Sequence, residues 1–217
     1  MTTTEHARDY LPAAGHHWSL PLYDPLTKLI GVDRVRKRWL AQADLLPSYR
    51  VLDVGCGTGS LAVLITRSQP GVHVVGLDPD AKALARGRRK AERAGTSIQF
   101  DEGFADDLPY PDAVFDRVFS SFMFHHVAPG QKQGMLREVR RVLKPGGRLE
   151  LLDFAGPDVG SNGLLARVMH SHHRLKDNAK ERILTLMAEA GLVNARQVGR
   201  GALLVGRVAY YQASRNG

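Results

Sequence analysis

The sequence has a single cysteine, Cys56, among its 217 residues. A lone cysteine cannot form an internal disulfide or supply a cysteine-rich zinc site, so nothing in the composition requires an oxidising compartment. The chain also lacks an apolar run of membrane-spanning length. Residues 1–18 carry charges and histidines where a secretory signal needs an unbroken apolar stretch. These absences predict a cytoplasmic protein that is soluble, or at most peripheral to a membrane.

Internal repeats, low-complexity tracts and long polar linkers are lacking as well. The 22 glycines and 11 prolines are spread along the chain rather than pooled. With 217 residues, 43% of them hydrophobic, the chain is long enough to bury one sizeable core. We therefore expect a single domain over residues 1–217.

Acidic residues are the scarcer charged class, with 22 Asp and Glu against 30 Lys and Arg and a net charge of +8. Such an excess suits an anionic partner, whether nucleic acid, an acidic lipid surface or a phosphorylated substrate. The basic residues concentrate in two runs, 34–38 and 86–93, which we interpret as solvated helix faces. Peripheral membrane contact stays open, and no stable nucleic-acid complex is expected because no basic strand is interleaved with aromatic residues. The oligomeric state is not indicated.

From residue 51 onward, short apolar runs alternate with helical patterns, which is typical of βαβ units around a parallel sheet. The predicted strands cover residues 50–54, 72–77, 98–101, 114–121 and 148–154, and the predicted helices cover 58–67, 80–93, 131–143 and 179–190. Two final apolar runs, 192–198 and 202–212, flank Gly199-Arg200-Gly201, which predicts a hairpin turn at these glycines. We expect an α/β fold with a seven-stranded, mostly parallel sheet, an antiparallel C-terminal hairpin strand, and helices on both faces.

Two regions lie outside this alternation. Residues 1–49 contain an amphipathic pattern that predicts a helix near 26–46, and residues 155–177 connect the fifth strand to the last helix. In open α/β sheets the ligand binds at the carboxyl ends of the strands. We therefore predict that residues 1–49 cover the cofactor or substrate and that residues 155–177 form a lid.

The segment VLDVGCGTG, residues 51–59, leads from an apolar strand into a G-x-G-x-G turn. Glycines there allow close approach of a ligand and positive φ. Amide N–H groups at the start of the following helix can meet polar ligand atoms. The second predicted strand ends in Asp78, whose carboxylate can accept hydrogen bonds from a ribose diol. Together these features predict a nucleoside-containing cofactor.

Two residues separate the two nucleoside cofactors that fit this description. The dinucleotide fingerprint requires Gly or Ala where this chain has Ser60. Asp53 would lie near the pyrophosphate of NAD, whereas its charge would attract the ammonium group of a bound amino acid. The charge therefore favours S-adenosylmethionine over NAD.

Five ordered motifs span residues 50–154: VLDVGCGTG, Leu77-Asp78, LPYPDAVFDRV, SSFMFHHV and LREVRRVLKPGGRLELLDF. In these motifs the sequence resembles the class I methyltransferases, and in particular the subgroup that includes ubiquinone/menaquinone C-methyltransferases. The resemblance implies a Rossmann-like fold, S-adenosyl-L-methionine as cofactor, S-adenosyl-L-homocysteine as product, and a small-molecule or lipid acceptor. Residues before 50 and after 155 match only loosely, although HHWSLPLYD is similar to the segment that covers the cofactor in such enzymes.

The resemblance also implies a set of cofactor-binding residues. Those at the methionine end are Asp53, Gly55, Cys56, Gly57 and Gly59. Asp78 would bind the ribose hydroxyls and Pro79 would border the adenine, while Ser120, Ser121 and Tyr23 would complete the pocket, with His16 and His17 as further cover.

After the third strand this chain departs from the family, which has Asp-Ala where the chain has Phe104-Ala105-Asp106. Phe104 and Ala105 are still expected to border the adenine. Either Phe104 packs on the adenine and Asp106 takes the polar contact, or Asp106 caps the following turn.

Methyl transfer from a sulfonium is an in-line displacement in which charge is lost, so positioning and desolvation supply much of the acceleration. A phenol, an acidic carbon or an ammonium acceptor additionally requires a base. The candidates are His125 and His126, after the fourth strand, and Asp153, at the end of the fifth. Each also has a structural alternative: pocket wall or packing for the histidines, and a structural carboxylate for Asp153.

Other absences narrow the chemistry. No cysteine outside the cofactor turn is available to attack a pyrimidine, the fourth strand lacks an Asn-Pro-Pro-Tyr turn, and there is no convincing acidic pair for magnesium. We predict metal-independent methylation of a quinone-type carbon, a phospholipid amine or another metabolite. The alternatives are an RNA methyltransferase, a non-catalytic S-adenosylmethionine-binding protein and an NAD enzyme.

Overall fold

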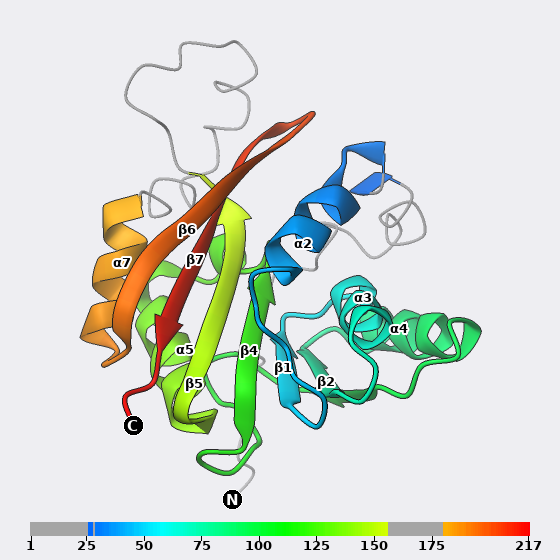
Figure 1. The fold of residues 1–217 in the computed structure, drawn as a ribbon, viewed down its shortest axis with the longest axis horizontal. Helices are drawn as coiled ribbons and strands as arrows, with labels where there is room; N and C mark the ends of the chain where they lie inside the picture. Colours follow the sequence, from blue (N-terminus) through cyan, green and yellow to red (C-terminus); the bar gives the residue numbers. More distant parts are fainter. Residues whose placement is uncertain (1–25, 28, 156–179) are drawn as a thin grey trace, which may run out of the picture.

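Seven strands form one sheet in the computed structural model, which describes residues 26–27, 29–155 and 180–217. The strand order is β3-β2-β1-β4-β5-β7-β6 (Figure 1). The parallel strands β1 to β5 span Arg50–Val54, His73–Asp78, Gln99–Glu102, Phe115–Ser121 and Leu143–Phe154. Strand β7 (Gly206–Ser214) pairs antiparallel with both β5 and β6 (Val193–Leu203). The predicted sheet and its antiparallel C-terminal strand are confirmed.

The chain order of the strands reverses at β1, which pairs with β2 on one side and β4 on the other. The register sets Val54 beside both Leu77 and Ser120, so the carboxyl ends of the three strands meet at one edge. Such a switch point is where open α/β sheets bind ligands. The fold therefore places the residues that follow β1, β2 and β4 around one site.

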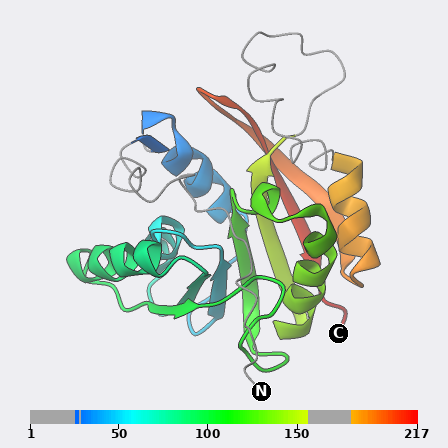
Figure 2. The same ribbon diagram turned by 180° about the vertical axis from the view of Figure 1, so that it is seen from behind.

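Helices cover both faces of the sheet. Helices α2 (Val32–Leu40), α3 (Ser60–Ser68) and α4 (Ala81–Arg93) lie on the face seen in Figure 1, and α5 (Pro129–Val142) and α7 (Lys180–Glu189) lie on the face seen in Figure 2. The apolar residues that recur at helical spacing along α5 are all fully buried: Met135, Leu136, Val139 and Val142. No helix in the described ranges combines the length and apolarity needed to cross a bilayer.

The C-terminal hairpin turns later than the sequence predicts. Strand β6 continues through Gly199 and Gly201 to Leu203, and the chain turns at residues 204–205. A Cβ on Gly199 would lie 2.7 Å from Cδ2 of Tyr210, and one on Gly201 would lie 2.6 Å from its Oη. The predicted turn at these glycines was wrong because they make room for the tyrosine ring across the strand pair.

The helix predicted over 26–46 is also shorter in the structure. Gly31 precedes α2 with a left-handed φ of 94°, and beyond Leu40 the chain forms turns and loop. Asp44 and Ser48 have φ values of 47° and 70°, which a right-handed helix cannot include. The amphipathic pattern therefore extended past the true ends of the helix.

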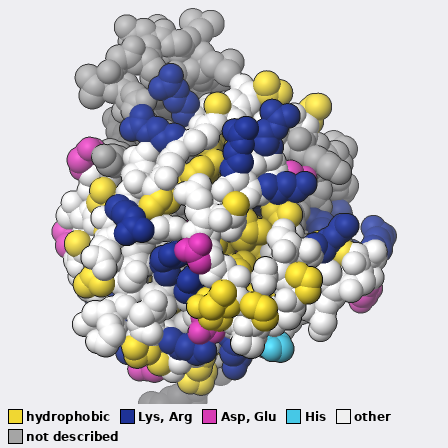
Figure 3. All heavy atoms as spheres, viewed as in Figure 1, with side chains coloured by type: hydrophobic (Ala, Val, Ile, Leu, Met, Phe, Trp, Pro, Cys, Tyr) yellow, Lys and Arg dark blue, Asp and Glu magenta, His cyan; other side chains and the backbone are white. Residues whose placement is uncertain are grey.

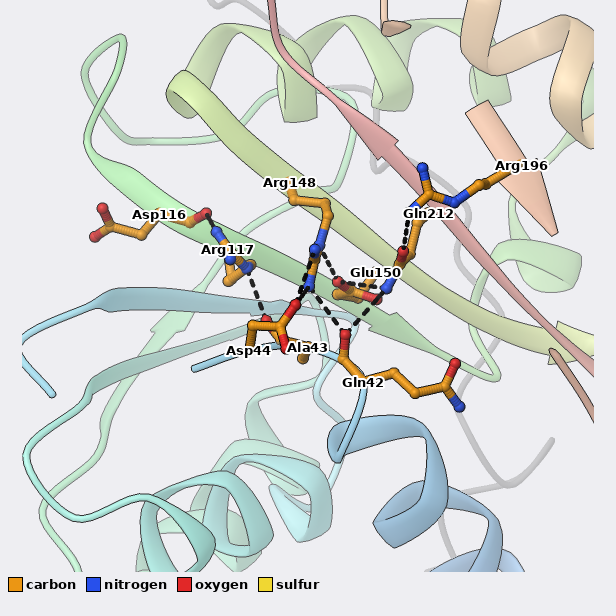
Figure 4. Close-up of polar contacts among 9 residues, drawn as sticks. All are labelled: Gln42, Ala43, Asp44, Asp116, Arg117, Arg148, Glu150, Arg196 and Gln212. Atoms are coloured by element: carbon orange, nitrogen blue, oxygen red, sulfur yellow. Dashed lines mark hydrogen bonds and ion pairs between the residues drawn. The ribbon is translucent and has the colours of Figure 1, made fainter. Parts of the chain in front are cut away.

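A buried polar network fixes the segment after α2 to the sheet (Figure 4). Arg148 donates from Nη2 to the carbonyl of Gln42 (3.0 Å) and from Nε to Glu150 (2.6 Å). Gln212 donates to both oxygens of Glu150 and to the carbonyl of Gln42, at 3.1–3.2 Å. Arg117 donates to the carbonyl of Ala43 (3.0 Å). Burial raises the pKa of Glu150 to about 7, while Arg148 opposes the rise. The network sets where α2 lies over the sheet.

Candidate cofactor and acceptor site

The glycine-rich turn after β1 has the backbone conformation that its sequence predicts. Gly55, Gly57 and Gly59 have φ values of 69°, 53° and 69°, which side chains rarely adopt. A Cβ on Gly59 would also lie 2.8 Å from the ring of Phe100. The turn therefore requires glycine both for its backbone conformation and for its close packing against β3.

The amides of this turn are largely used within the protein. The amides of Gly55 and Cys56 donate to the carbonyl of Leu77 (2.8 and 3.0 Å). The amide of Gly59 donates to the carbonyl of Cys56, and the amide of Gly57 donates to the carboxylate of Asp78. The amides of these four turn residues are therefore not available to a ligand, and the role predicted for the amides at the start of the following helix stays a prediction. What the turn provides is three positions without side chains, at Gly55, Gly57 and Gly59. Burial raises the pKa of the Cys56 thiol and keeps it neutral.

Asp78 ends β2 beside the turn. Its Oδ2 accepts from the amide of Gly57 (2.8 Å) and its Oδ1 accepts from the amide of Asp80 (2.9 Å). Each carboxylate oxygen can accept a further hydrogen bond, so the group still fits a ribose diol. Burial raises the pKa of Asp78 to about 6, and the two amides oppose the rise. Pro79 follows, half-buried.

Asp53 and Ser120 contribute buried oxygens without partners at the ends of β1 and β4. Asp53 is 1% exposed, and among the described residues neither its Oδ2 nor the hydroxyl of Ser120 has a hydrogen-bond partner. Burial raises the pKa of Asp53 to about 7; Arg36 opposes the rise and the nearby Asp78 adds to it. Buried acceptors left unsatisfied cost free energy, which a bound ammonium group would recover. The amino-acid end of S-adenosylmethionine fits this position.

Arg36 is the site residue that the sequence interpretation missed. It belongs to the basic run that we expected to be solvated, yet it is buried and donates from Nε to the hydroxyl of Ser121 (3.1 Å). Its guanidinium lies 5.8 Å from the ring centroid of Phe122. Helical spacing could have found it, because Arg36 lies on the same face as the buried Val35 and Trp39.

Two of the three predicted catalytic residues are paired. The ring Nδ1 of His125 lies 2.7 Å from Oδ1 of Asp153, and the His125 backbone amide donates to Oδ2 (2.8 Å). Asp153 is fully buried and also accepts from the amide of Phe154 (2.7 Å). With Nδ1–H donating to this carboxylate, Nε2 is the nitrogen left to accept a proton. The ring of His126 lies against that of His125, with centroids 4.0 Å apart.

Aromatic rings adjoin this pair. Phe154 packs edge-on against His125, with ring centroids 5.3 Å apart, and Phe122 lies 5.2 Å from Phe154. Phe122 has a φ of 57°, a strained value for a bulky residue, and its amide donates to Leu152 (2.8 Å). Phe122 and Phe154 therefore form a row of rings between Arg36 of α2 and the His125–Asp153 pair.

The predicted adenine end lies just past β3. The amide of Gly103 donates to the carbonyl of Asp78 (3.3 Å), so this segment begins beside the predicted ribose site. Phe104 and Asp106 are half-buried, and Ala105 packs against the main core. Both roles predicted for Asp106, the adenine contact and the turn cap, stay predictions.

Several predicted features lie outside the described residues. These are Tyr23, His16 and His17, together with residues 156–177 of the predicted lid. Within the described ranges, no group of three or more His, Cys, Asp or Glu side chains is arranged to hold a metal ion. Metal independence stays a prediction.

Comparison with known proteins identifies relatives of the chain. Residues 51–147 match the methyltransferase domain family. The chain is 43% identical over 151 residues to the demethylmenaquinone methyltransferase of Thermus thermophilus, covering 68% of each chain. It is 44% identical over 155 residues to the enzyme of that name from Deinococcus radiodurans, covering 70% of this chain and 64% of the relative. The similarity thus extends over about two thirds of these relatives.

Solved structures share the fold at low sequence identity. The YcgJ protein of Bacillus subtilis superposes with a TM-score of 0.68 at 19% identity, covering 93% of this chain and all of that one. The [4+2]-cyclase SpnF superposes with a TM-score of 0.73 at 18% identity, covering 96% and 98%. At this level of identity the similarity concerns the fold alone.

Proposed function

The chain belongs to the class I S-adenosylmethionine-dependent methyltransferases, and on that premise we propose that it methylates a small aromatic acceptor of the quinol type. The pairing of His125 with Asp153 carries the proposal, because a ring carbon or its hydroxyl must lose a proton during methylation. The relatives named demethylmenaquinone methyltransferases support an acceptor of this class.

Residues at the ends of β1, β2 and β4 are suited to hold the cofactor. In the proposal Asp53 receives the ammonium group, Arg36 balances the carboxylate, and Asp78 accepts the ribose hydroxyls. The bound cofactor supplies an electrophilic methyl carbon on a sulfonium sulfur. Because transfer removes charge, the protein's main tasks are to position the acceptor and to exclude water.

His125 acts as the general base. Its Nε2 accepts the proton of the acceptor hydroxyl, which makes the adjoining ring carbon nucleophilic. Asp153 holds the imidazole in the required tautomer and stabilises the imidazolium that forms. The carbon that receives the methyl group then releases its hydrogen as a proton, and the oxygen regains a proton from the His125 imidazolium, which restores the aromatic quinol with the release of one proton overall. The His125 side chain is 16% exposed, so protons can pass on to solvent.

Phe122 and Phe154 account for the preference for a flat acceptor. A planar ring placed beside them gains offset or edge-on aromatic contacts. The guanidinium of Arg36 lies over the ring of Phe122 and would close that side of the acceptor site. An aliphatic amine would gain less from these walls, so a quinol fits the site better than a phospholipid headgroup.

The first experiment tests the reaction itself. The purified full chain is incubated with S-adenosylmethionine and reduced demethylmenaquinone, and the methylated quinol and S-adenosylhomocysteine are quantified by mass spectrometry. Phosphatidylethanolamine vesicles and total RNA serve as comparison acceptors. Methylation of the quinol alone supports the proposal. Methylation of lipid or RNA alone contradicts it, and so does the absence of turnover with every acceptor, the result expected of a non-catalytic cofactor-binding protein.

The second experiment tests the base. We expect His125→Gln to lower kcat about 100-fold or more while the Kd for S-adenosylhomocysteine stays unchanged. Raising the pH should partly restore the rate, because the acceptor hydroxyl then ionises without help. His126→Gln is the matched control and should retain most of the activity. Equal losses in the two variants, without pH rescue, would show that His125 is not the base.

The proposal includes a cytoplasmic location. The only cysteine of the chain is a buried thiol, which suits a reducing compartment. Recovery of the tagged native protein from an extracytoplasmic fraction would contradict this part of the proposal.

A further inference from the structure

Exposed leucines gather where the β6–β7 hairpin meets the short helical segment before α2. Leu204, in the hairpin turn, is 75% exposed, and Leu26 and Leu29 are 56% and 75% exposed. The amide of Leu204 donates to the carbonyl of Ile30 (3.3 Å), so the two segments lie side by side. We call these three leucines the leucine tip. A cluster of exposed apolar side chains on adjoining segments indicates an interaction site.

Basic side chains surround the leucine tip. Exposed residues of α2 and the hairpin supply them: Arg34, Lys37, Arg38, Arg200 and Arg207. Across residues 29–40 and 196–210 the one acidic residue is Asp33, which is half-buried. Figure 3 shows Lys and Arg side chains gathered over α2 and the hairpin, with hydrophobic side chains at the upper rim of the same face. The surface therefore combines apolar tips with positive charge.

We propose that the leucine tip and its basic surround dock on an anionic lipid bilayer. The leucines would insert at the boundary between headgroups and acyl chains, while the basic side chains would meet the anionic headgroups. The hairpin extends past the end of β5, so the surface projects from the fold (Figure 1). A projecting apolar tip suits insertion, and the net charge of +8 opposes pairing with a second copy of the chain.

The position of the surface gives docking a consequence for the site. Strand β5 ends at Phe154, which pairs with Val208, and the hairpin continues from there beyond the carboxyl edge of the sheet. The His125–Asp153 pair lies at that same edge. Docking would bring the acceptor side of the site toward the bilayer. The docking proposal does not rest on the proposed reaction, because membrane binding can be measured without turnover.

The test is flotation of the full chain with vesicles of phosphatidylcholine alone and of phosphatidylcholine with phosphatidylglycerol. We expect binding to the anionic vesicles only, weakened by high salt. Leu204→Glu should lower the partition coefficient about 10-fold or more, because it removes an inserted leucine and adds a repelled charge. Arg34→Glu should lower it about 5-fold or more.

Matched controls lie at the opposite edge of the sheet. Leu46 is 53% exposed and precedes β1, and Arg67 is an exposed residue in the last turn of α3. Leu46→Glu and Arg67→Glu should leave binding unchanged. Absence of vesicle binding would overturn the proposal, and so would equal losses in test and control variants. Light scattering that shows a dimer broken by Leu204→Glu, without vesicle binding, would assign the surface to a second copy instead.

Discussion

Cofactor affinity should depend on pH through Asp53. Burial raises the pKa of this carboxyl to about 7, and its Oδ2 has no partner among the described residues. A bound ammonium group favours the ionised carboxylate, so binding must displace the proton that the free protein holds below that pH. Acidification therefore weakens binding, and alkaline pH does not.

The size of the effect follows from the pKa. For a free-state pKa near 7 and a bound state that stays ionised, Kd rises tenfold for each pH unit below 7. Between about pH 8 and about pH 5.5 the increase is about 30-fold, or about 2 kcal/mol. Asp78, whose pKa burial raises to about 6, adds to the slope only at the acidic end.

Calorimetric titration with S-adenosylhomocysteine at several pH values measures this linkage. Repeating it in buffers of different ionisation enthalpy counts the protons released. In Asp53→Asn, affinity should be lower at alkaline pH and nearly independent of pH until Asp78 titrates. Circular dichroism at each pH verifies that the chain remains folded. A wild-type Kd that is constant across the range, or a variant with the wild-type slope, would refute the reasoning.

Three further predictions concern stability, each measured by chemical denaturation. Burial raises the pKa of Glu150 in the folded protein from 4.5 to about 7, so between these pH values the folded protein binds more protons than the unfolded chain and becomes more stable as pH falls. Glu150→Gln should remove this part of the dependence of unfolding free energy on pH, and an unchanged dependence would contradict the prediction. Gly59→Ala should cost about 2 kcal/mol or more, because it combines positive φ with contact on Phe100. Gly95→Ala, at a φ of 63° with open space around it, should show only the smaller backbone cost, and equal losses would refute the packing argument. Tyr210→Phe should stabilise the chain by about 1 kcal/mol, because it deletes a buried hydroxyl without a partner among the described residues, and a loss of stability would reveal a partner.

Features that depend on neighbouring residues were predictable from the sequence. The glycine turn, Asp78 at the end of β2 and the buried stripe of α5 follow from local backbone preference and hydrophobic period, and the structure contains all three. Element ends were less predictable. The glycines of β6 have the composition of a turn, yet their role depends on Tyr210 across the strand pair.

The sequence by itself determined the order of strands and helices and the cofactor, because hydrophobic period and glycine spacing act over a few residues. Only the tertiary structure decided which distant groups meet. Arg36 reaches Ser121, 85 positions away, because α2 packs its apolar stripe on the sheet and so buries a residue that the charge pattern assigned to solvent. His125 and Asp153 were separate candidates until two adjacent parallel strands brought their ends together and buried the carboxylate beside the ring nitrogen Nδ1. Such contacts depend on sheet register and helix docking, which are set by the free energy of the whole core.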